Sequence, residues 1–581
     1  MKKSQKEDEQ DWSYGKVLRV QFAILTFLFG IAYALFGFNL ENYEAGCTTA
    51  IQGIFTGGVP FLGFADLAHV FTIKVYAWLE TRFVGWHSYS LIMLVGQFVS
   101  IQVLMFFTWL LLRPIMGSPW RTLVVQIGIF IMVDFDNIVN INLTRIAFFA
   151  SGSGILALVY LSKIYPNQRI LSLVAGCLLF TYGMLTRLEP AILITVYLGL
   201  VFVVLNYNLK STWLKLAIPV ILLALLELLI WQKSDSSSLA VKTIDNSFYY
   251  DVHSKRNLKP LPIGASTYDS LMYDAALSWT IGDTAHINYA YFANHVVAGK
   301  GLWWEKLLHL EMDVPGLWGY LTKYRAALLL ILLANLILLF QPACRGLLRW
   351  RLLALNALFW LTVVFVSALF KTEYRLLSPM IYFYLHALII YAAYYQILPL
   401  VFWHKKSLAL VVVIAGLSVL FITEAIADSR HYQAEQRQRE KIMAELKTLA
   451  TDKYLVLDGY SVDIITSTVA FTPRLNLPVK AIMLYDFGPL WLLPHYSQYL
   501  QGIAQRPAEW GAMFDFLYEN RAQVLYVTSP ERAIFINRYL QVVHGKKYGL
   551  KAINGSFELD AWTNFGSTLQ YFTIVSNESL Q

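Results

Sequence analysis

The sequence predicts a polytopic α-helical membrane protein that ends in a small extracytoplasmic α/β domain. Three observations lead to this class. Of the 581 residues, 57% are hydrophobic and only 14% are charged, whereas a soluble domain is about one quarter charged. Apolar runs of membrane-spanning length recur as far as residue 426. The remainder, 427–581, shows short apolar strands that alternate with helical segments.

The first apolar run follows a polar cytoplasmic tail, 1–17, and is interpreted as a retained signal-anchor helix. Lys16 and Arg19 flank the run, and it lacks a small-residue cleavage site. Ten further runs follow, so residues 18–426 are expected to hold about eleven transmembrane helices. The expected ranges are 18–38, 89–112, 120–133, 144–162, 170–186, 190–207, 213–232, 324–341, 352–370, 376–402 and 407–426.

Two long loops, 39–88 and 233–323, interrupt the apolar runs. The second half of the first loop has apolar residues at helical spacing, which predicts a helix lying in the membrane interface. The other loop is long enough to be functional or to form a small domain. With the N-terminus inside, Lys and Arg fall in the short inside loops, as the positive-inside rule requires. This topology places both long loops and the C-terminal domain on the outer face, and it explains the net charge of +8 without nucleic acid.

The C-terminal domain is expected to begin with an exposed amphipathic helix at 430–450. Alternating strands and helices then predict a small α/β fold without a glycine-rich phosphate loop. Strands are expected at 453–458, 481–485, 523–528 and 570–575, and helices near 508–520 and 530–543.

Acidic side chains gather near the outer ends of the expected spans. A carboxylate at this depth can take a proton from an acceptor hydroxyl, or it can hold a divalent metal with water. The alternative is that each acid is solvated or caps a helix, as Asp136 or Asn137 could do ahead of the run at 144–162. The candidate acids are Glu41, Glu44, Asp66, Asp134 and Asp136.

Basic side chains on the outer face are candidates for binding a phosphate. Lys371 and Arg375 stand out, because the positive-inside rule gives outer loops little reason to keep cations. Arg187 could present a guanidinium to a phosphate or form a structural ion pair with Glu189. Arg145, at the head of an expected span, is a similar candidate. The alternative for each is an ordinary interfacial anchor.

Other chemistry finds less support in the sequence. The histidines lack a metal-ligand spacing, although His286 and His295 could meet in the large loop. No Gly-x-Ser-x-Gly elbow and no Walker loop is present, which argues against a serine hydrolase and against ATP-driven transport.

Over residues 14–426 the layout resembles the GT-C superfamily of integral-membrane glycosyltransferases. These include protein O-mannosyltransferases, aminoarabinose transferases of lipid A and bacterial polyprenyl-phosphate-sugar transferases. The matching features are a short cytoplasmic tail, a long first outer loop with an acidic residue just past the first span, and a second acidic site after the third. Glu41-Asn-Tyr-Glu44 stands where the family has its first-loop acids, and Asp134 or Asp136 stands at the second site. The tryptophan-rich motif of oligosaccharyltransferases is absent.

The resemblance implies an enzyme of the bacterial cytoplasmic (inner) membrane, whose donor is a sugar on polyprenyl phosphate. Glu44, or else Glu41, would be the general base, and the anomeric carbon would be inverted. The acceptor would be a glycan, a lipid or a protein. The leaving phosphate would be held by Lys371 and Arg375, with Arg187 and Arg145 in reserve. Any divalent metal, Mg²⁺ or Mn²⁺, would bind Glu41, Glu44, Asp134 and Asp136.

Two other functions remain open from the sequence. A transporter or flippase of lipid-linked material would often carry inverted repeats and broken mid-membrane helices, and no matching halves are found. A scaffold that binds an envelope partner through its C-terminal domain would not need the outer carboxylates. Loss of function on Glu44→Gln would therefore favour the enzyme over the scaffold.

Overall fold

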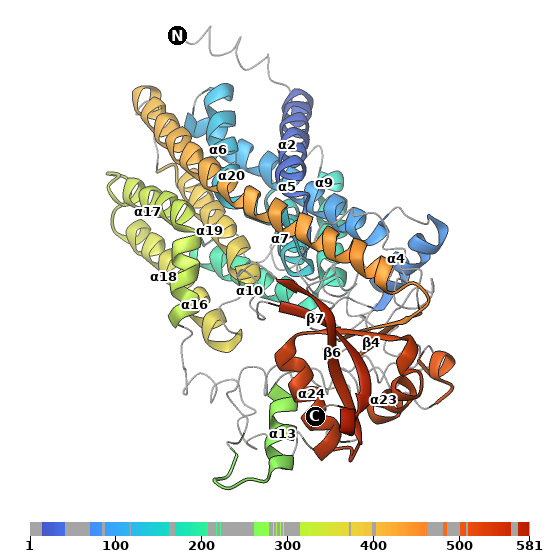
Figure 1. Ribbon diagram of the computed structural model, residues 1–581. Coiled ribbons are helices and arrows are strands. Elements are labelled where there is room, and N and C mark those ends of the chain that lie inside the picture. The colour runs from blue at the N-terminus through green and yellow to red at the C-terminus, as the bar shows by residue number, and fades with distance from the viewer. Residues whose placement is uncertain are drawn as a thin grey trace. The chain divides into compact units, whose positions relative to one another are not determined.

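A computed structural model shows the architecture of the protein (Figure 1). The chain divides into two compact units: Met1–Asn39, Ser90–Leu229 and His309–His431 form the first, and Leu40–Tyr89, Ile230–Leu308 and Tyr432–Gln581 form the second. The structure describes residues 14–40, 70–83, 87–116, 118–161, 169–206, 261–277, 314–370, 374–397, 403–458, 480–484, 500–506, 509–558 and 568–579, with single residues between these ranges.

The first unit is a bundle of apolar helices. Among the described residues, four of its helices are long and apolar enough to cross a membrane, and a bent pair could provide a fifth span. The helices are α2 (Tyr14–Phe36), α5 (Ser88–Met116), α6 (Pro119–Val139), α7 (Leu143–Leu156) with the π-helix η1 (Ala157–Leu161), α9 (Arg169–Thr186), α10 (Leu188–Val204), α16 (Val314–Lys323), α17 (Arg325–Leu339), α18 (Leu347–Phe370), α19 (Tyr374–Tyr394) and α20 (Trp403–Leu449), of which the residues up to His431 belong to this unit. Two-residue strands, β1 (Asn39–Leu40) and β2 (Asn140–Ile141), follow α2 and α6.

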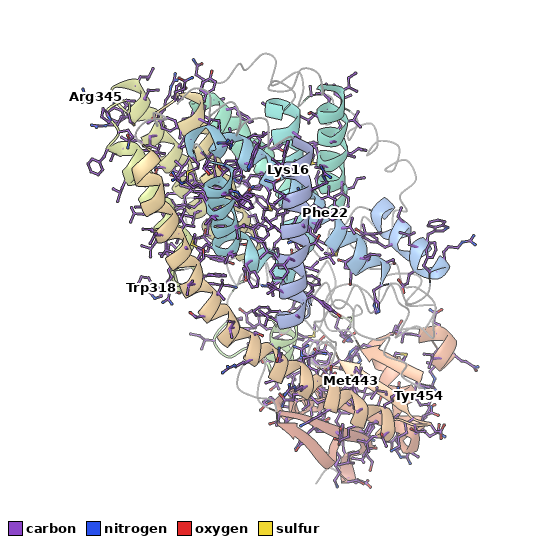
Figure 2. All side chains as sticks on the ribbon, turned by 90° about the horizontal axis from the view of Figure 1, so that it is seen from above. Lys16, Phe22, Trp318, Arg345, Met443 and Tyr454 are labelled. Carbon is purple, nitrogen blue, oxygen red and sulfur yellow. The ribbon has the colours of Figure 1, made fainter. Side chains whose placement is uncertain are left out.

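These helices confirm the predicted class of a polytopic helical membrane protein. Ten of the expected spans coincide with helices, while the run at 213–232 lies largely outside the described residues. Large apolar side chains remain on the outside of the bundle, where lipid would cover them. Phe22 on α2 and Trp318 on α16, labelled in Figure 2, are 55% and 69% exposed.

Two predicted elements at the end of the bundle are in fact one helix. The span expected at 407–426 and the amphipathic helix expected at 430–450 join into the 47-residue α20, the long orange helix of Figure 1. No glycine or proline interrupts residues 424–432, so nothing in the backbone forces a break there. In the first unit, the Ser429 hydroxyl of α20 donates to the carbonyl of Leu35 on α2 (2.7 Å).

Helices α7 and α9 pack closely against each other. Every residue of α7 is buried. A Cβ on Gly154 would lie 2.6 Å from the backbone nitrogen of Phe180, and one on Gly183 would lie 2.2 Å from the Ser151 hydroxyl. Glycine therefore allows the two backbones to approach closely, as small residues do in membrane bundles.

The second unit contains a five-stranded sheet with the order β4-β3-β5-β7-β6. Strands β4, β3 and β5 are parallel, and β7 pairs antiparallel with both β5 and β6. The strands are β3 (Tyr454–Asp458), β4 (Lys480–Leu484), β5 (Val524–Thr528), β6 (Tyr548–Glu558) and β7 (Thr568–Ser576). The other elements of this unit are α4 (Val70–Arg82), α13 (Thr267–Leu277), α23 (Trp510–Glu519), α24 (Pro530–Val542) and the short 3₁₀ helices η5 (Arg521–Gln523) and η6 (Asn577–Ser579).

The sheet confirms the predicted α/β character of the C-terminal region and adds one strand. The four predicted strands and both predicted helices are present. Strand β6 was not predicted, because Gly549 and Gly555 interrupt its apolar alternation. Gly555 lies at the irregular part of the β6–β7 ladder and has a φ of +126°, a conformation that favours glycine.

Candidate functional site

The site is organised around Asp136 at the C-terminal end of α6. Pro119 starts this helix, and apolar residues continue as far as Val133, so the acid follows the apolar part of the helix by less than one turn. The chain then passes through β2 into α7, where the Asn142 side chain caps the helix by accepting from the Thr144 amide (2.7 Å).

The alternative that Asp136 or Asn137 caps α7 is therefore wrong. Helix α6 continues through both residues to Val139, and α7 starts only at Leu143. The side chain of Asp136 is thus available for tertiary contacts.

Four donors surround the Asp136 carboxylate. The Arg145 guanidinium lies 2.8 Å from Oδ2, and the Tyr324 hydroxyl donates to the same oxygen (2.8 Å). The Lys323 ammonium lies 3.4 Å from Oδ1, to which the Asn140 side chain also donates (2.9 Å). Both oxygens are therefore engaged with groups from three parts of the chain.

The bend between α16 and α17 positions the two groups that come from far along the chain. The helix axes turn by 74° at this break. Lys323 is the last residue of α16, and Tyr324 lies between the helices with non-helical backbone angles. The neighbouring Tyr320 hydroxyl donates to the carbonyl of Leu377 (3.2 Å), which fixes the corner against α19.

A second group of contacts fixes the end of α6 among its neighbours. The Asn137 side-chain oxygen accepts from the Ser378 hydroxyl on α19 (2.8 Å) and from Arg145 (3.4 Å). The Gln97 side chain on α5 donates to the Asn137 carbonyl. Asn137 and Gln97 are fully buried, so these hydrogen bonds form in a place where an unmade bond would be costly.

The Asp136 cluster, formed by Asp136, Asn140, Arg145, Lys323 and Tyr324, carries excess positive charge. The cations Arg145 and Lys323 and the carboxylate of Asp136 leave one net positive charge. The Arg145 side chain is only 3% exposed and the Asp136 side chain 17%, whereas the Lys323 side chain is 43% exposed. Lys323 is thus the cation that an incoming anion would meet first.

A second guanidinium lies at the start of α7. Arg187 donates to the Thr144 hydroxyl (2.6 Å), and Thr144 is adjacent to Arg145 in the chain. The ion pair of Arg187 with Glu189, one of the two predicted alternatives, is present at 3.6 Å, and the Glu189 side chain is 63% exposed. Because the exposed Glu189 carboxylate neutralises the charge of Arg187 only weakly, Arg187 adds to the positive potential at the start of α7.

The remaining predicted site residues are placed only in part. Glu41, Glu44 and Lys371 lie outside the described residues. Asp134 belongs to α6, but its side chain is not among those described. Arg375 is half-buried in the first turn of α19, three residues before Ser378.

Lys323 and Tyr324 were not among the predicted site residues. Lys323 immediately precedes the expected span at 324–341, on the side that the predicted topology makes the outer one. The argument that selected Lys371, a cation that the positive-inside rule does not explain, applies equally to Lys323. The sequence contains no comparable signal for Tyr324.

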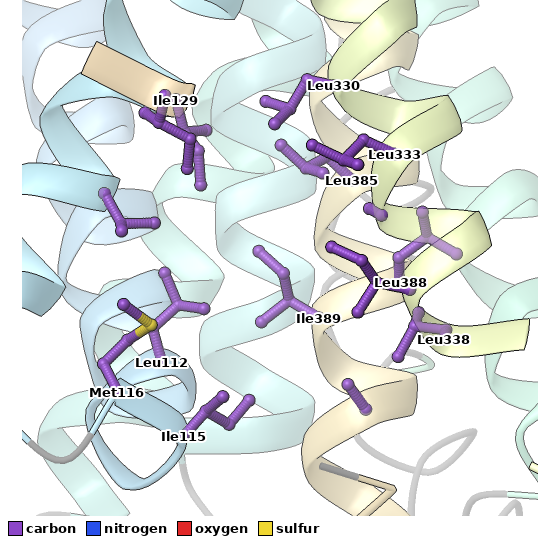
Figure 3. A pocket seen from close by; sticks show the side chains of 15 residues that line it. Leu112, Ile115, Met116, Ile129, Leu330, Leu333, Leu338, Leu385, Leu388 and Ile389 are labelled. Atoms are coloured by element: carbon purple, nitrogen blue, oxygen red, sulfur yellow. The ribbon is translucent and has the colours of Figure 1, made fainter. Parts of the chain in front are cut away.

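An apolar cavity of about 100 Å³ lies in the first unit between α5, α6, α17, α19 and α20 (Figure 3). Its labelled lining residues are all aliphatic or methionine: Leu112, Ile115, Met116, Ile129, Leu330, Leu333, Leu338, Leu385, Leu388 and Ile389. Helix α6 also carries Asp136 and Asn137, and two other lining helices, α5 and α19, supply Gln97 and Ser378, which bond to Asn137.

The cavity and the polar groups occur at similar separations along α6 and α19. Ile129 precedes Asp136 by seven residues on α6, and Leu385 follows Ser378 by seven residues on α19. Seven residues correspond to about 10 Å of helix and return to nearly the same face. The arrangement therefore offers a cationic end and an apolar interior, which suits an amphipathic anion.

Two solved structures of ArnT from Cupriavidus metallidurans are similar to this chain. The apo structure matches with a TM-score of 0.46 at 11% sequence identity, over 96% of this chain and 98% of that chain. The structure bound to undecaprenyl phosphate matches with a TM-score of 0.49, at the same identity and coverage. No protein-family model matches the sequence, and no curated protein matches it. Because both structural likenesses are weak, the function is inferred below from the residues of this chain.

Proposed function

We propose that the protein is an integral-membrane glycosyltransferase that moves a sugar from a polyprenyl-phosphate donor to an envelope acceptor. The observation that carries this proposal is an apolar cavity that lies seven residues, or about two helical turns, from Asp136 on α6 and from Ser378 on α19. A phosphate headgroup would meet Lys323 first and the guanidinium groups of Arg145 and Arg187 behind it. The first part of the polyprenyl chain would enter the cavity.

In this proposal the cationic groups stabilise the leaving phosphate. As the bond between the anomeric carbon and the phosphate oxygen breaks, the electron pair and its negative charge stay with the lipid phosphate. Positive groups held in place before the reaction lower the energy of such a transition state. Arg375, in the first turn of α19, and Lys371, four residues before it in the sequence, would extend the same phosphate site.

The proposed role of Asp136 is to position these cations. Its oxygens already accept from Arg145 and Tyr324, among others, so it has little capacity left to take a proton. Two neighbouring cations also make Asp136 a poor ligand for Mg²⁺ or Mn²⁺, and no step of the proposed reaction passes through a metal.

The general base is proposed to be Glu44, with Glu41 as the alternative. The base takes the proton of an acceptor hydroxyl while the hydroxyl oxygen forms a bond to the anomeric carbon. The lipid phosphate leaves from the opposite face, so that the configuration is inverted. We place the reaction at the outer face of a bacterial inner membrane, with the N-terminus in the cytoplasm.

The phosphate site can be tested by binding of undecaprenyl phosphate to the full-length protein in detergent. We expect Lys323→Gln to weaken binding by about 10- to 100-fold, because a hydrogen bond to a charged group is worth roughly 1.5–3 kcal/mol. Arg345→Gln is the matched control, since Arg345 is an exposed cation beyond the far end of α17. Equal affinities for the two variants would refute the assigned site.

The reaction itself requires a cellular test. Mass spectrometry of lipid-linked sugars and envelope glycans would compare a deletion strain that expresses the wild type, Lys323→Gln or Glu44→Gln. Accumulation of one polyprenyl-phosphate sugar and loss of one glycan residue are expected for Glu44→Gln. Wild-type glycans with Glu44→Gln would instead favour the scaffold, and flipping of a lipid analogue in liposomes would favour the transporter.

A further inference from the structure

A second polar cluster lies within the second unit, and the proposed transferase chemistry does not use it. It contains Asp283, His286 and His544, whose ligand-type atoms all lie within 4.8 Å of one another. The first two residues come from the long 230–308 segment, and His544 follows α24 in the C-terminal part.

Local structure aims the three side chains at one point. The His286 amide donates to the Asp283 carbonyl (3.1 Å), and this turn brings the two side chains together. At the other end, α24 stops at Val542 and Gly545 adopts a φ of +63°, so that the chain turns towards β6 immediately after His544. His544 is therefore held in a tight helix-to-strand connection.

Both imidazoles meet the same carboxylate oxygen. His286 Nδ1 lies 3.0 Å from Asp283 Oδ2, and His544 Nε2 lies 2.7 Å from it. The Asp283 side chain is 1% exposed and that of His544 is 10% exposed, whereas that of His286 is 28% exposed. The cluster is thus buried on one side and reachable from the other.

We propose that Asp283, His286 and His544 bind a divalent transition-metal ion of the zinc class. One carboxylate oxygen and two imidazole nitrogens form a ligand set that suits Zn²⁺. Ligands about 2.1 Å from a tetrahedral metal lie roughly 3.4 Å apart. Each imidazole nitrogen would therefore move away from Asp283 Oδ2 by less than 1 Å, and the two imidazole nitrogens, which lie within 4.8 Å of each other, would settle at the same spacing. Water would take the fourth position, on the exposed side of His286.

The surroundings of the triad support a metal site. The fully buried Tyr539 hydroxyl donates to Asp283 Oδ2 (2.8 Å), as groups that orient a ligating carboxylate do. The His544 ring packs at 5.6 Å from the buried ring of Trp510. A Cβ on Gly511 would lie 2.8 Å from His544 Nδ1, so this glycine leaves the space that the imidazole occupies.

A metal here would join parts of the chain that are far apart in sequence. Asp283 and His286 lie more than 250 residues before His544. Binding of an ion only to the assembled triad would stabilise that assembly by mass action. The expected role is therefore structural, fixing the 283–286 turn onto the end of α24, and it is independent of the proposed transferase reaction.

The test uses the full-length protein in detergent, with any affinity tag removed and bound metal stripped by EDTA. Zn²⁺ is titrated by calorimetry, retained metal is counted by mass spectrometry after gel filtration, and Co²⁺ is followed through its visible absorption. We expect one ion per chain and an absorption spectrum typical of tetrahedral coordination. Asp283→Asn and His544→Gln should each lower the affinity by at least about 100-fold, while His87→Gln, a histidine outside the triad, should not change it.

A variant that keeps all three ligands guards against loss of folding. Tyr539→Phe removes only the hydroxyl that orients Asp283 and is expected to lower the Zn²⁺ affinity by about 10- to 100-fold. Hydrogen exchange of β5 and β6 in the metal-free state reports whether the domain remains folded. If the stripped wild type binds neither Zn²⁺ nor Co²⁺, or if all the variants bind as the wild type does, the three residues form a hydrogen-bonded cluster and the proposal is wrong.

Discussion

Removal of the negative charge at Asp136 is the most informative perturbation of the first unit. In Asp136→Asn, the Arg145 side chain stays buried, with 3% of its surface exposed, but it loses its carboxylate partner. Breaking a buried ion pair from one side costs about 3–5 kcal/mol, because the remaining charge is left uncompensated. At roughly 2 °C per kcal/mol for a large chain, the apparent Tm should fall by about 6–10 °C. Tryptophan fluorescence of the detergent-solubilised protein at a fixed scan rate measures this shift.

Glu189→Gln provides the matched control. It makes the same acid-to-amide change at the partner of another arginine, but the Glu189 side chain is 63% exposed and 3.6 Å from Arg187. An exposed pair of this kind is worth less than about 1 kcal/mol. The double variant Asp136→Asn with Arg145→Met should recover part of the loss, since it also removes the orphaned charge. If Asp136→Asn melts within 2 °C of Glu189→Gln, the buried pair does not stabilise the bundle as argued.

Two further predictions concern packing and pH. Gly154→Ala should lower the apparent Tm by several degrees, because its Cβ would approach the Phe180 backbone nitrogen to 2.6 Å. Gly30→Ala is the control and should not change the Tm, because the space around its Cβ is open. Equal Tm values for the two variants would contradict the close α7–α9 packing. Burial raises the pKa of the Asp458 carboxyl in β3. Above this raised pKa the buried carboxylate is ionised and lowers the free energy of unfolding. Below the pKa that Asp458 has in the unfolded chain, the carboxyl is protonated in both states and this loss of stability disappears. Asp458→Asn should therefore slow hydrogen exchange of β3 at pH 8 and change it little near pH 4, and a benefit that grows towards acid pH would refute the assignment.

The elements that could be predicted from the sequence are those whose apolar residues follow a single clear periodicity. Apolar runs marked the helices of the bundle, and buried apolar strands such as 454–458 and 524–528 marked the sheet. Strand β6 was missed because two glycines break its alternation, and α20 was divided because its composition changes while its backbone continues. The composition of a helix changes where its surroundings change from lipid to water, and this point need not coincide with the end of the helix.

The candidate site was predictable as a set of charges but not as a set of contacts. Asp136 and Arg145 were selected for their places at the ends of apolar runs, and they form an ion pair. Their approach depends on the turn through β2, and the approach of Lys323 depends on the bend between α16 and α17. The metal candidate shows the same limit, because His286 meets His544 rather than a local histidine, and His295 lies outside the described residues. Sequence spacing cannot indicate contacts between segments this distant.

The geometry around Asp136 gives its two cationic neighbours, Arg145 and Lys323, different roles. Arg145 is almost fully buried and Asp136 compensates its charge, so the two residues act together on stability. Lys323 is 43% exposed and shares the same carboxylate at a longer distance, so its removal should leave the bundle folded while it weakens anion binding. A phosphate that approached Lys323 would in turn compete with Asp136 for the ammonium group. Stability should therefore respond mainly to Asp136 and Arg145, and lipid affinity mainly to Lys323.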